Sequence, residues 1–155
     1  MTGDWAGKAI KLYGRNKESG TYAFFKEHIL KDGDYKPGLR EQKDSEEVIQ
    51  EIIENPEAIG YSGIGFKKAG VNAISIGQTP DTMAAPSYLN CLTGAYPIAR
   101  FLYIYVNKRP SEPVSLLIAE FLRFVFSRTG QTDVVKAGFF PLPAQLVQET
   151  REDTE

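Results

Sequence analysis

Short apolar runs with strand character alternate along this sequence with segments whose apolar residues recur at helical spacing. This alternation constrains the fold most, because it predicts an α/β domain in which helices connect the strands of a sheet. The length of 155 residues suits one ordinary domain. The expected strands cover residues 8–13, 58–61, 71–76 and 101–106. Two helices are expected to start at residues 21 and 44, and two further helices are expected to cover residues 114–126 and 131–136.

Local signals sharpen several of these expectations. Asp44 stands three residues before Glu47, which is the spacing of a capping box and predicts a helix start. Residues 101–106 are apolar and aromatic on both faces, so they predict a strand at the centre of a sheet. Residues 58–61 read as a short buried strand, and Gly138 is placed to end the fourth helix at a C-cap position.

The composition excludes several classes of function. Lys and Arg number 18 against 20 Asp and Glu, and the formal net charge of −2 argues against a broad electrostatic grip on nucleic acid. The single cysteine, Cys91, rules out an internal disulfide, and the single histidine, His28, makes histidine-based metal sites hard to assemble. The first residues have no basic and apolar leader, so the sequence as given carries no signal peptide.

The loop between the first strand and the first helix carries the clearest candidate site. Arg15, Ser19, Gly20 and Thr21 are all hydrogen-bond donors, and Gly20 has no Cβ to keep a ligand away from the main chain. A helix N-terminus presents unpaired amides to an anion, and an arginine can bind two of its oxygens. The alternative is that Ser19 or Thr21 merely caps the helix.

Other polar residues have simpler interpretations. His28 lies on the apolar side of the first helix and is expected to be a packed core histidine. Arg100 could reach an anion, but a surface salt bridge is the preferred interpretation. No nucleophile and base stand at catalytic spacing, so the sequence does not indicate an enzyme.

The pattern of Arg15 and Ser19-Gly20-Thr21, followed by two phenylalanines, resembles the second lobe of phosphate-binding proteins of ABC transporters, which are two-lobed periplasmic receptors. Further patterns of that family follow in the family's order. They are AIGYSGIGF at 58–66, YPIARFLYIYVNK at 96–108, EFLRFV at 120–125, and GQ through GFFPL between residues 130 and 142. The resemblance covers almost the whole chain.

This resemblance implies one lobe of a type II periplasmic-binding-protein-like fold, with a mixed, mostly parallel sheet flanked by helices. It implies that Arg15 and the backbone and hydroxyls of Ser19, Gly20 and Thr21 contact inorganic phosphate. It further implies a periplasmic, non-enzymatic protein that works with an ABC transporter permease. We expect no cofactor, no metal ion and no nucleic acid partner. Relatives often carry an acidic residue two positions after the arginine. Lys17 stands there in this sequence, so Arg15 is less well oriented or Glu18 takes over that task.

A typical member of the family has a first lobe before the equivalent of residue 1, and that lobe supplies further donors and a carboxylate. By this analogy, residues 1–97 form the phosphate-binding second lobe, residues 98–143 a return segment that would pack on the missing first lobe, and residues 144–155 a flexible charged tail. The strand 101–106 and the helix 114–126 would then lack partners. We therefore expect a homo-oligomer through these segments, or docking onto a first lobe. The alternative is an interaction module derived from the same fold without ligand binding.

Overall fold

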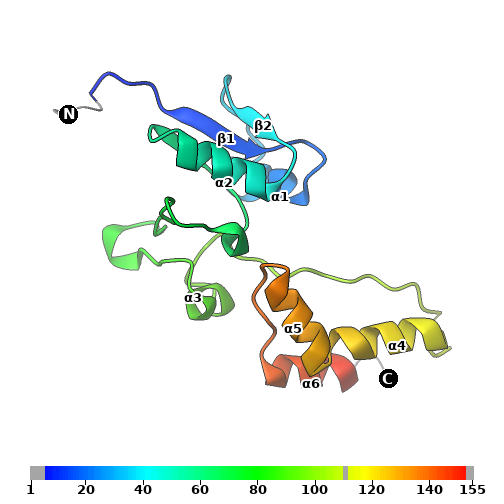
Figure 1. Ribbon diagram of the computed structural model, residues 1–155. Coiled ribbons are helices and arrows are strands. Elements are labelled where there is room, and N and C mark those ends of the chain that lie inside the picture. The colour runs from blue at the N-terminus through cyan, green and yellow to red at the C-terminus, as the bar shows by residue number, and fades with distance from the viewer. Residues whose placement is uncertain (1–5, 110–111, 153–155) are drawn as a thin grey trace. The chain divides into compact units, whose positions relative to one another are not determined.

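The computed structural model describes residues 6–109 and 112–152, and the chain divides into two compact units, residues 1–100 and 101–155 (Figure 1). The first unit contains a three-stranded sheet of β1 (Lys11–Arg15), β2 (Arg40–Gln42) and β3 (Ala58–Gly60). The strands are all parallel, in the order β2-β1-β3, and Tyr13 pairs with Arg40 on one side and with Gly60 on the other. The α/β fold with a parallel sheet flanked by helices is therefore confirmed.

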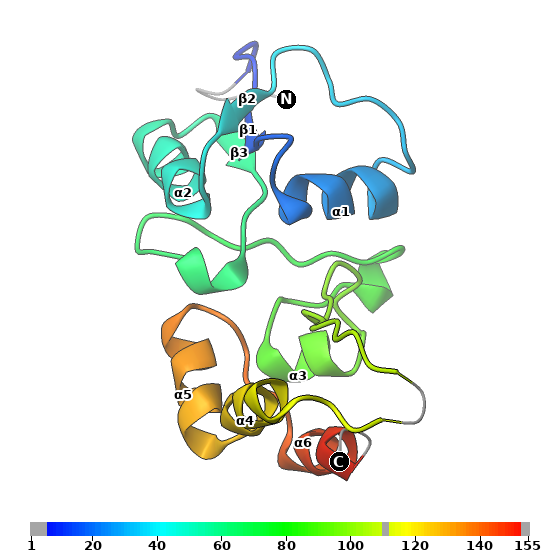
Figure 2. The same cartoon turned by 90° about the vertical axis from the view of Figure 1, so that its right-hand side faces the viewer.

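Two helices connect these strands, as parallel pairing requires. Helix α1 (Gly20–His28) lies between β1 and β2, and helix α2 (Ser45–Glu54) lies between β2 and β3. The chain moves to one side of β1 and then to the other, so right-handed crossovers place the helices on opposite faces of the sheet. Figure 2 shows α1 and α2 on opposite sides of the strands. Both expected helix starts are confirmed, and Asp44 caps α2 by accepting a hydrogen bond from the Glu47 amide at 2.9 Å.

The core of the first unit lies between the sheet and α2. Tyr13 and Val48 are fully buried, and Ile49 beside them is buried as well. The ring of Tyr13 packs inside while its hydroxyl accepts a hydrogen bond from Arg40 Nη1 at 2.9 Å. Val48 and Ile49 belong to the apolar stripe of α2, so the stripe buries itself against the strands as the sequence predicts.

An aromatic cluster joins α1 to the strand ends. The rings of Phe25 and Tyr61 stack at 4.2 Å, and those of Tyr22 and Tyr35 lie 4.4 Å apart. The Tyr61 hydroxyl donates to the Tyr35 hydroxyl at 3.1 Å, and Tyr35 donates to the Tyr22 carbonyl at 2.8 Å. A Cβ on Gly14 would collide with the Tyr61 ring, so this position in β1 needs a glycine.

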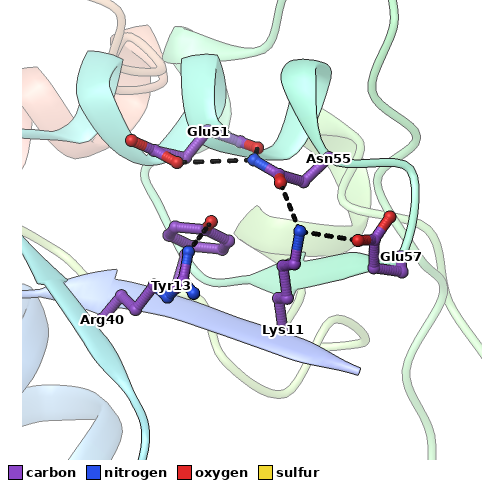
Figure 3. A network of polar contacts seen from close by, with 6 residues as sticks. All are labelled: Lys11, Tyr13, Arg40, Glu51, Asn55 and Glu57. Atoms are coloured by element: carbon purple, nitrogen blue, oxygen red, sulfur yellow. Dashed lines mark hydrogen bonds and ion pairs between the residues drawn. The ribbon is translucent and has the colours of Figure 1, made fainter. Parts of the chain in front are cut away.

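A polar network ties the start of β1 to the end of α2 (Figure 3). Lys11 Nζ lies 2.6 Å from a carboxylate oxygen of Glu57 and donates to Asn55 Oδ1 at 2.7 Å. Asn55 Nδ2 in turn donates to the Glu51 carbonyl at 2.8 Å. The side chain of Asn55 therefore satisfies a backbone carbonyl of the last turn of α2 and fixes the lysine at the same time.

The rest of the first unit has little regular structure. It contains two single 3₁₀ turns, η1 (Ile64–Phe66) and η2 (Pro80–Thr82), and the short helix α3 (Tyr88–Leu92). The strand expected at 71–76 is wrong, since only an isolated antiparallel bridge between Ile76 and Ala84 forms there. Residues 58–61 do contain a strand, β3, but its Ile59 is exposed because β3 lies at an edge of the sheet.

The described residues of the second unit form three helices, α4 (Leu116–Val125), α5 (Arg128–Lys136) and α6 (Ala144–Glu152). The expected C-cap is confirmed: Gly138 has a φ of 85°, and the amides of Gly138 and Phe139 donate to the carbonyls of Val135 and Val134. Helix α6 occupies much of the segment for which the sequence indicates a flexible charged tail.

The strand expected at 101–106 is wrong in this structure. Its residues have no regular secondary structure and are exposed, and Tyr105 is 90% exposed. A strand exists only through hydrogen bonds to a neighbour, and no described strand pairs with this segment. On α4, Leu116, Leu117, Phe121 and Phe124 are exposed too, and only Leu122 is buried. None of the described helices is both long and apolar enough to cross a bilayer.

We expect the change Val48→Ala to lower the free energy of unfolding by about 2 kcal/mol, because it empties space in the core beneath the sheet. Chemical denaturation monitored by circular dichroism measures this change. The matched control is Ile10→Ala, at a side chain that is 68% exposed, where a loss below about 0.5 kcal/mol is expected. Equal losses for the two variants would contradict the location of the core.

The hydrogen bond from Lys11 lowers the pKa of the Glu57 carboxyl. The stability that this pair contributes is therefore present above the unfolded-state pKa of Glu57 and is lost as the pH falls through its lowered folded-state pKa. We expect Lys11→Met to move the Glu57 pKa upward, as measured by carboxyl NMR titration. The matched control is Lys36→Met, at an exposed lysine outside this network, which should leave the titration of Glu57 unchanged.

Candidate anion-binding site

The candidate site lies at the carboxyl edge of the sheet. Because β1, β2 and β3 are parallel, the loops that follow them all leave from this edge. The loop after β1 leads into α1, and the loop after β2 leads into α2. Open α/β sheets bind ligands at this edge, where the chain leaves β1 toward one side and reaches β3 on the other. The edge therefore combines two helix N-termini with the residues that end the strands.

Ser19 is the N-cap of α1, so the capping interpretation of the sequence holds for this residue. Its hydroxyl oxygen accepts a hydrogen bond from the Thr21 amide at 3.1 Å, and its carbonyl accepts one from the Ala23 amide at 3.2 Å. Ser19 is also buried, which fixes the hydroxyl in this position. Capping uses one of the first amides of α1 and leaves those of Gly20 and Tyr22 without an intrahelical acceptor. An anion at this end would bind these remaining amides.

Arg15 points toward the other helix N-terminus. Its Nη1 donates to Ser45 Oγ at 3.0 Å, and its Nη2 donates to the Lys43 carbonyl at 3.2 Å. Its Nε is buried and has no hydrogen-bond partner within the described residues. The groups that orient the guanidinium are thus a hydroxyl and a carbonyl at the start of α2. Glu18 does not take over the orientation of Arg15, because no described carboxylate bonds to Arg15.

The residues after β3 complete this arrangement. Ser62 Oγ donates to the Ser45 carbonyl at 3.1 Å, and the Tyr61 hydroxyl lies 3.4 Å from the Arg15 carbonyl. Burial raises the pKa of Tyr61, so its hydroxyl stays protonated and remains a donor at neutral pH. Sequence reasoning missed Ser45 and Ser62 as supporting residues. The signal was available for Ser62, which directly follows the predicted strand 58–61, but not for Ser45, because the sequence predicted no strand at residues 40–42, where β2 lies.

Arg100 lies beside the first turn of α1. Its guanidinium carbon is 4.8 Å from the centre of the Phe24 ring, and its Nη2 is 3.5 Å from the position that a Cβ on Gly20 would take. The salt bridge preferred for Arg100 from the sequence is not found among the described residues. The structure therefore brings Arg100, rather than Arg15, next to Gly20.

His28 is not a core residue, contrary to the expectation from its position on α1. It is exposed, its ring stacks on that of Phe24 at 4.3 Å, and its Nδ1 lies 3.2 Å from the Phe24 carbonyl. The face of α1 that carries these two rings is not buried by a sheet, so helical spacing alone misassigned it. Among the described residues no group of three or more His, Cys, Asp or Glu could hold a metal ion.

Two curated proteins show what the chain is similar to in sequence. The chain is 46% identical over 149 residues to the "Phosphate-binding protein PstS" of Pseudomonas aeruginosa, covering 96% of this chain and 46% of that protein. It is 29% identical over 142 residues to the protein of the same name from Staphylococcus saprophyticus, covering 90% of this chain and 43% of that one. The chain thus spans less than half the length of these relatives.

A solved structure agrees with these sequence relatives. The crystal structure of a possible phosphate binding protein from Planctomyces limnophilus matches with a TM-score of 0.69 and 26% identity, over 97% of this chain and 54% of that one. The sequence model of a family described as "PBP superfamily domain" matches residues 3–129. Because this match covers most of the sequence, the chain belongs to the family of PBP superfamily domains.

Proposed function

We propose that the chain binds inorganic phosphate, as one lobe of a solute-binding protein of an ABC phosphate uptake system. The single observation that carries this proposal is the set of donors at the carboxyl edge of the sheet, where no described carboxylate bonds to Arg15. The phosphate-binding relatives support it, because two of them match almost the whole chain. The site residues are Arg15, Ser19, Gly20 and Thr21.

Helix dipoles and amides supply part of the binding energy. The first turn of α1 concentrates partial positive charge, and the amides of Gly20 and Tyr22 can each donate to a phosphate oxygen. The side chain of Ser19 keeps its hydroxyl proton available for donation while its oxygen accepts from Thr21. The Thr21 hydroxyl adds a further donor at the same turn. Together, these amides and hydroxyls of the first turn of α1 recognise both the negative charge of the ion and the geometry of its oxygens.

Arg15 contributes a guanidinium that the fold has already oriented. Ser45 and the Lys43 carbonyl use one proton on each terminal nitrogen, so the second proton on each and the Nε proton remain for an anion. Holding the guanidinium in advance lowers the entropy lost on binding.

The complete receptor needs a second lobe. We propose that a partner lobe closes on this site, buries the ion, and presents the closed form to the membrane permease in the periplasm. The exposed apolar surface formed by residues 101–106 and by Leu116, Leu117, Phe121 and Phe124 of α4 is the surface through which this chain packs on that lobe or on a second copy. No catalytic step is part of this function.

We expect the chain to bind phosphate and the change Arg15→Gln to weaken binding by about tenfold or more, because a charged hydrogen bond is worth more than 1.4 kcal/mol. Isothermal titration calorimetry measures both affinities. The matched control is Arg40→Gln, which removes the same charge from β2, where Arg40 bonds to Tyr13. Phosphate binding that is equal in the wild-type protein and in Arg15→Gln would contradict the proposed role of Arg15.

We also expect the chain to self-associate through the surface of residues 101–106 and α4. Light scattering after size exclusion should give a mass above 17.3 kDa for the wild-type chain and the monomer mass for Leu117→Asp. Leu117 is 81% exposed, so the aspartate does not damage the core. The control Ile74→Asp, at another exposed apolar residue, should leave the assembly intact. A wild-type monomer at all concentrations would exclude the oligomer.

A further inference from the structure

We infer that Arg100 is a second arginine of the anion site, which binds the ion held at the first turn of α1 together with the Gly20 amide. This inference rests on the proposed function and adds a residue that neither the motif nor the helix N-terminus alone would indicate. Its basis is the place of the guanidinium, next to the one residue of α1 that has no side chain.

The distances allow one ion to reach both groups. Arg100 Nη2 lies 3.5 Å from the position of a Cβ on Gly20, and covalent geometry puts that position about 2.5 Å from the Gly20 nitrogen. The two nitrogens are therefore no more than about 6 Å apart. Two hydrogen bonds of about 2.9 Å that meet at one oxygen span almost this distance. If the two nitrogens instead donate to two different oxygens of the same tetrahedral ion, the hydrogen bonds reach across an even larger separation.

The contact with Phe24 explains why the guanidinium stays in this position. Phe24 lies one turn after Gly20 on α1, and a cation over an aromatic face gains about 0.5–1 kcal/mol at an exposed site. The backbone before Arg100 is also held, because the Ala99 amide donates to the Tyr96 carbonyl at 3.3 Å. The ring fixes the plane of the guanidinium and leaves its N–H groups free to point at a ligand.

The charge of Arg100 is not compensated locally. No described carboxylate lies within ion-pair distance of Arg100, and its exposed side chain lies beside the N-terminus of α1. A positive side chain at the positive end of a helix is unfavourable unless an anion joins them. The position of Arg100 beside Gly20 and Phe24 is thus electrostatically unfavourable when the site is empty and favourable when an oxyanion is bound. The second guanidinium also favours the doubly charged form of phosphate over the singly charged form.

The test compares Arg100→Gln and Arg100→Lys with the wild-type chain and with Arg128→Gln, which removes the same charge from α5. Inorganic phosphate is titrated at several pH values across neutrality, with calorimetry and with the NMR shifts of the Gly20 and Thr21 amides as readouts. We expect Arg100→Gln to weaken binding about tenfold and to flatten the rise of affinity with pH, since phosphate becomes the dianion as pH rises. Arg100→Lys should keep part of the affinity, and Arg128→Gln should bind like the wild-type chain.

The outcomes separate the two proposals. Phosphate that leaves the Gly20 and Thr21 amides of the wild-type chain unshifted would overturn both the proposed function and the role of Arg100. Binding that is lost in Arg15→Gln but unchanged in Arg100→Gln would overturn the role of Arg100 alone. If Arg100→Gln and Arg128→Gln weakened phosphate binding equally, the effect would come from net charge alone, and the proposed role of Arg100 would be overturned as well. Arg100 is exposed, so these variants are expected to fold, and circular dichroism checks this.

Discussion

The parallel pairing of β1 with β2 on one side and β3 on the other is the constraint on which the rest of the first unit depends. Parallel strands require crossover helices, so this pairing fixes α1 and α2 to opposite faces of the sheet. It also brings the starts of both helices to one edge. Arg15 can hydrogen-bond to Ser45 across thirty residues of sequence only because β1 and β2 end side by side.

That edge concentrates donors, and this determines what it can recognise. Helix amides and hydroxyls lie there with two arginines, Arg15 at the start of α2 and Arg100 beside the first turn of α1, and no described carboxylate bonds to either arginine. Such a set of hydrogen-bond donors favours oxyanions but discriminates poorly between ions of the same shape and charge. A buried acceptor for a proton of phosphate would provide that separation, and the first lobe implied by the family resemblance is where such a carboxylate is expected.

The second unit exposes many of its apolar side chains to solvent. Its helices α4, α5 and α6 bury few apolar side chains, and residues 101–106 expose a continuous apolar and aromatic stretch. Exposed apolar surface of this kind is unfavourable in water and marks a place of contact. The chain spans less than half the length of its relatives, which is consistent with the proposal that this surface packs against a second lobe or a second copy.

The sequence by itself determined the α/β class, the starts of α1 and α2 to within a residue or two and the C-cap at Gly138, because these depend on neighbours a few residues away. It could not determine that residues 101–106 stay unpaired, since a strand needs hydrogen bonds from another segment. It also could not determine where two long side chains point. Only the tertiary structure turned Arg15 toward Ser45 and set Arg100 beside Gly20, because each contact joins residues far apart in the sequence.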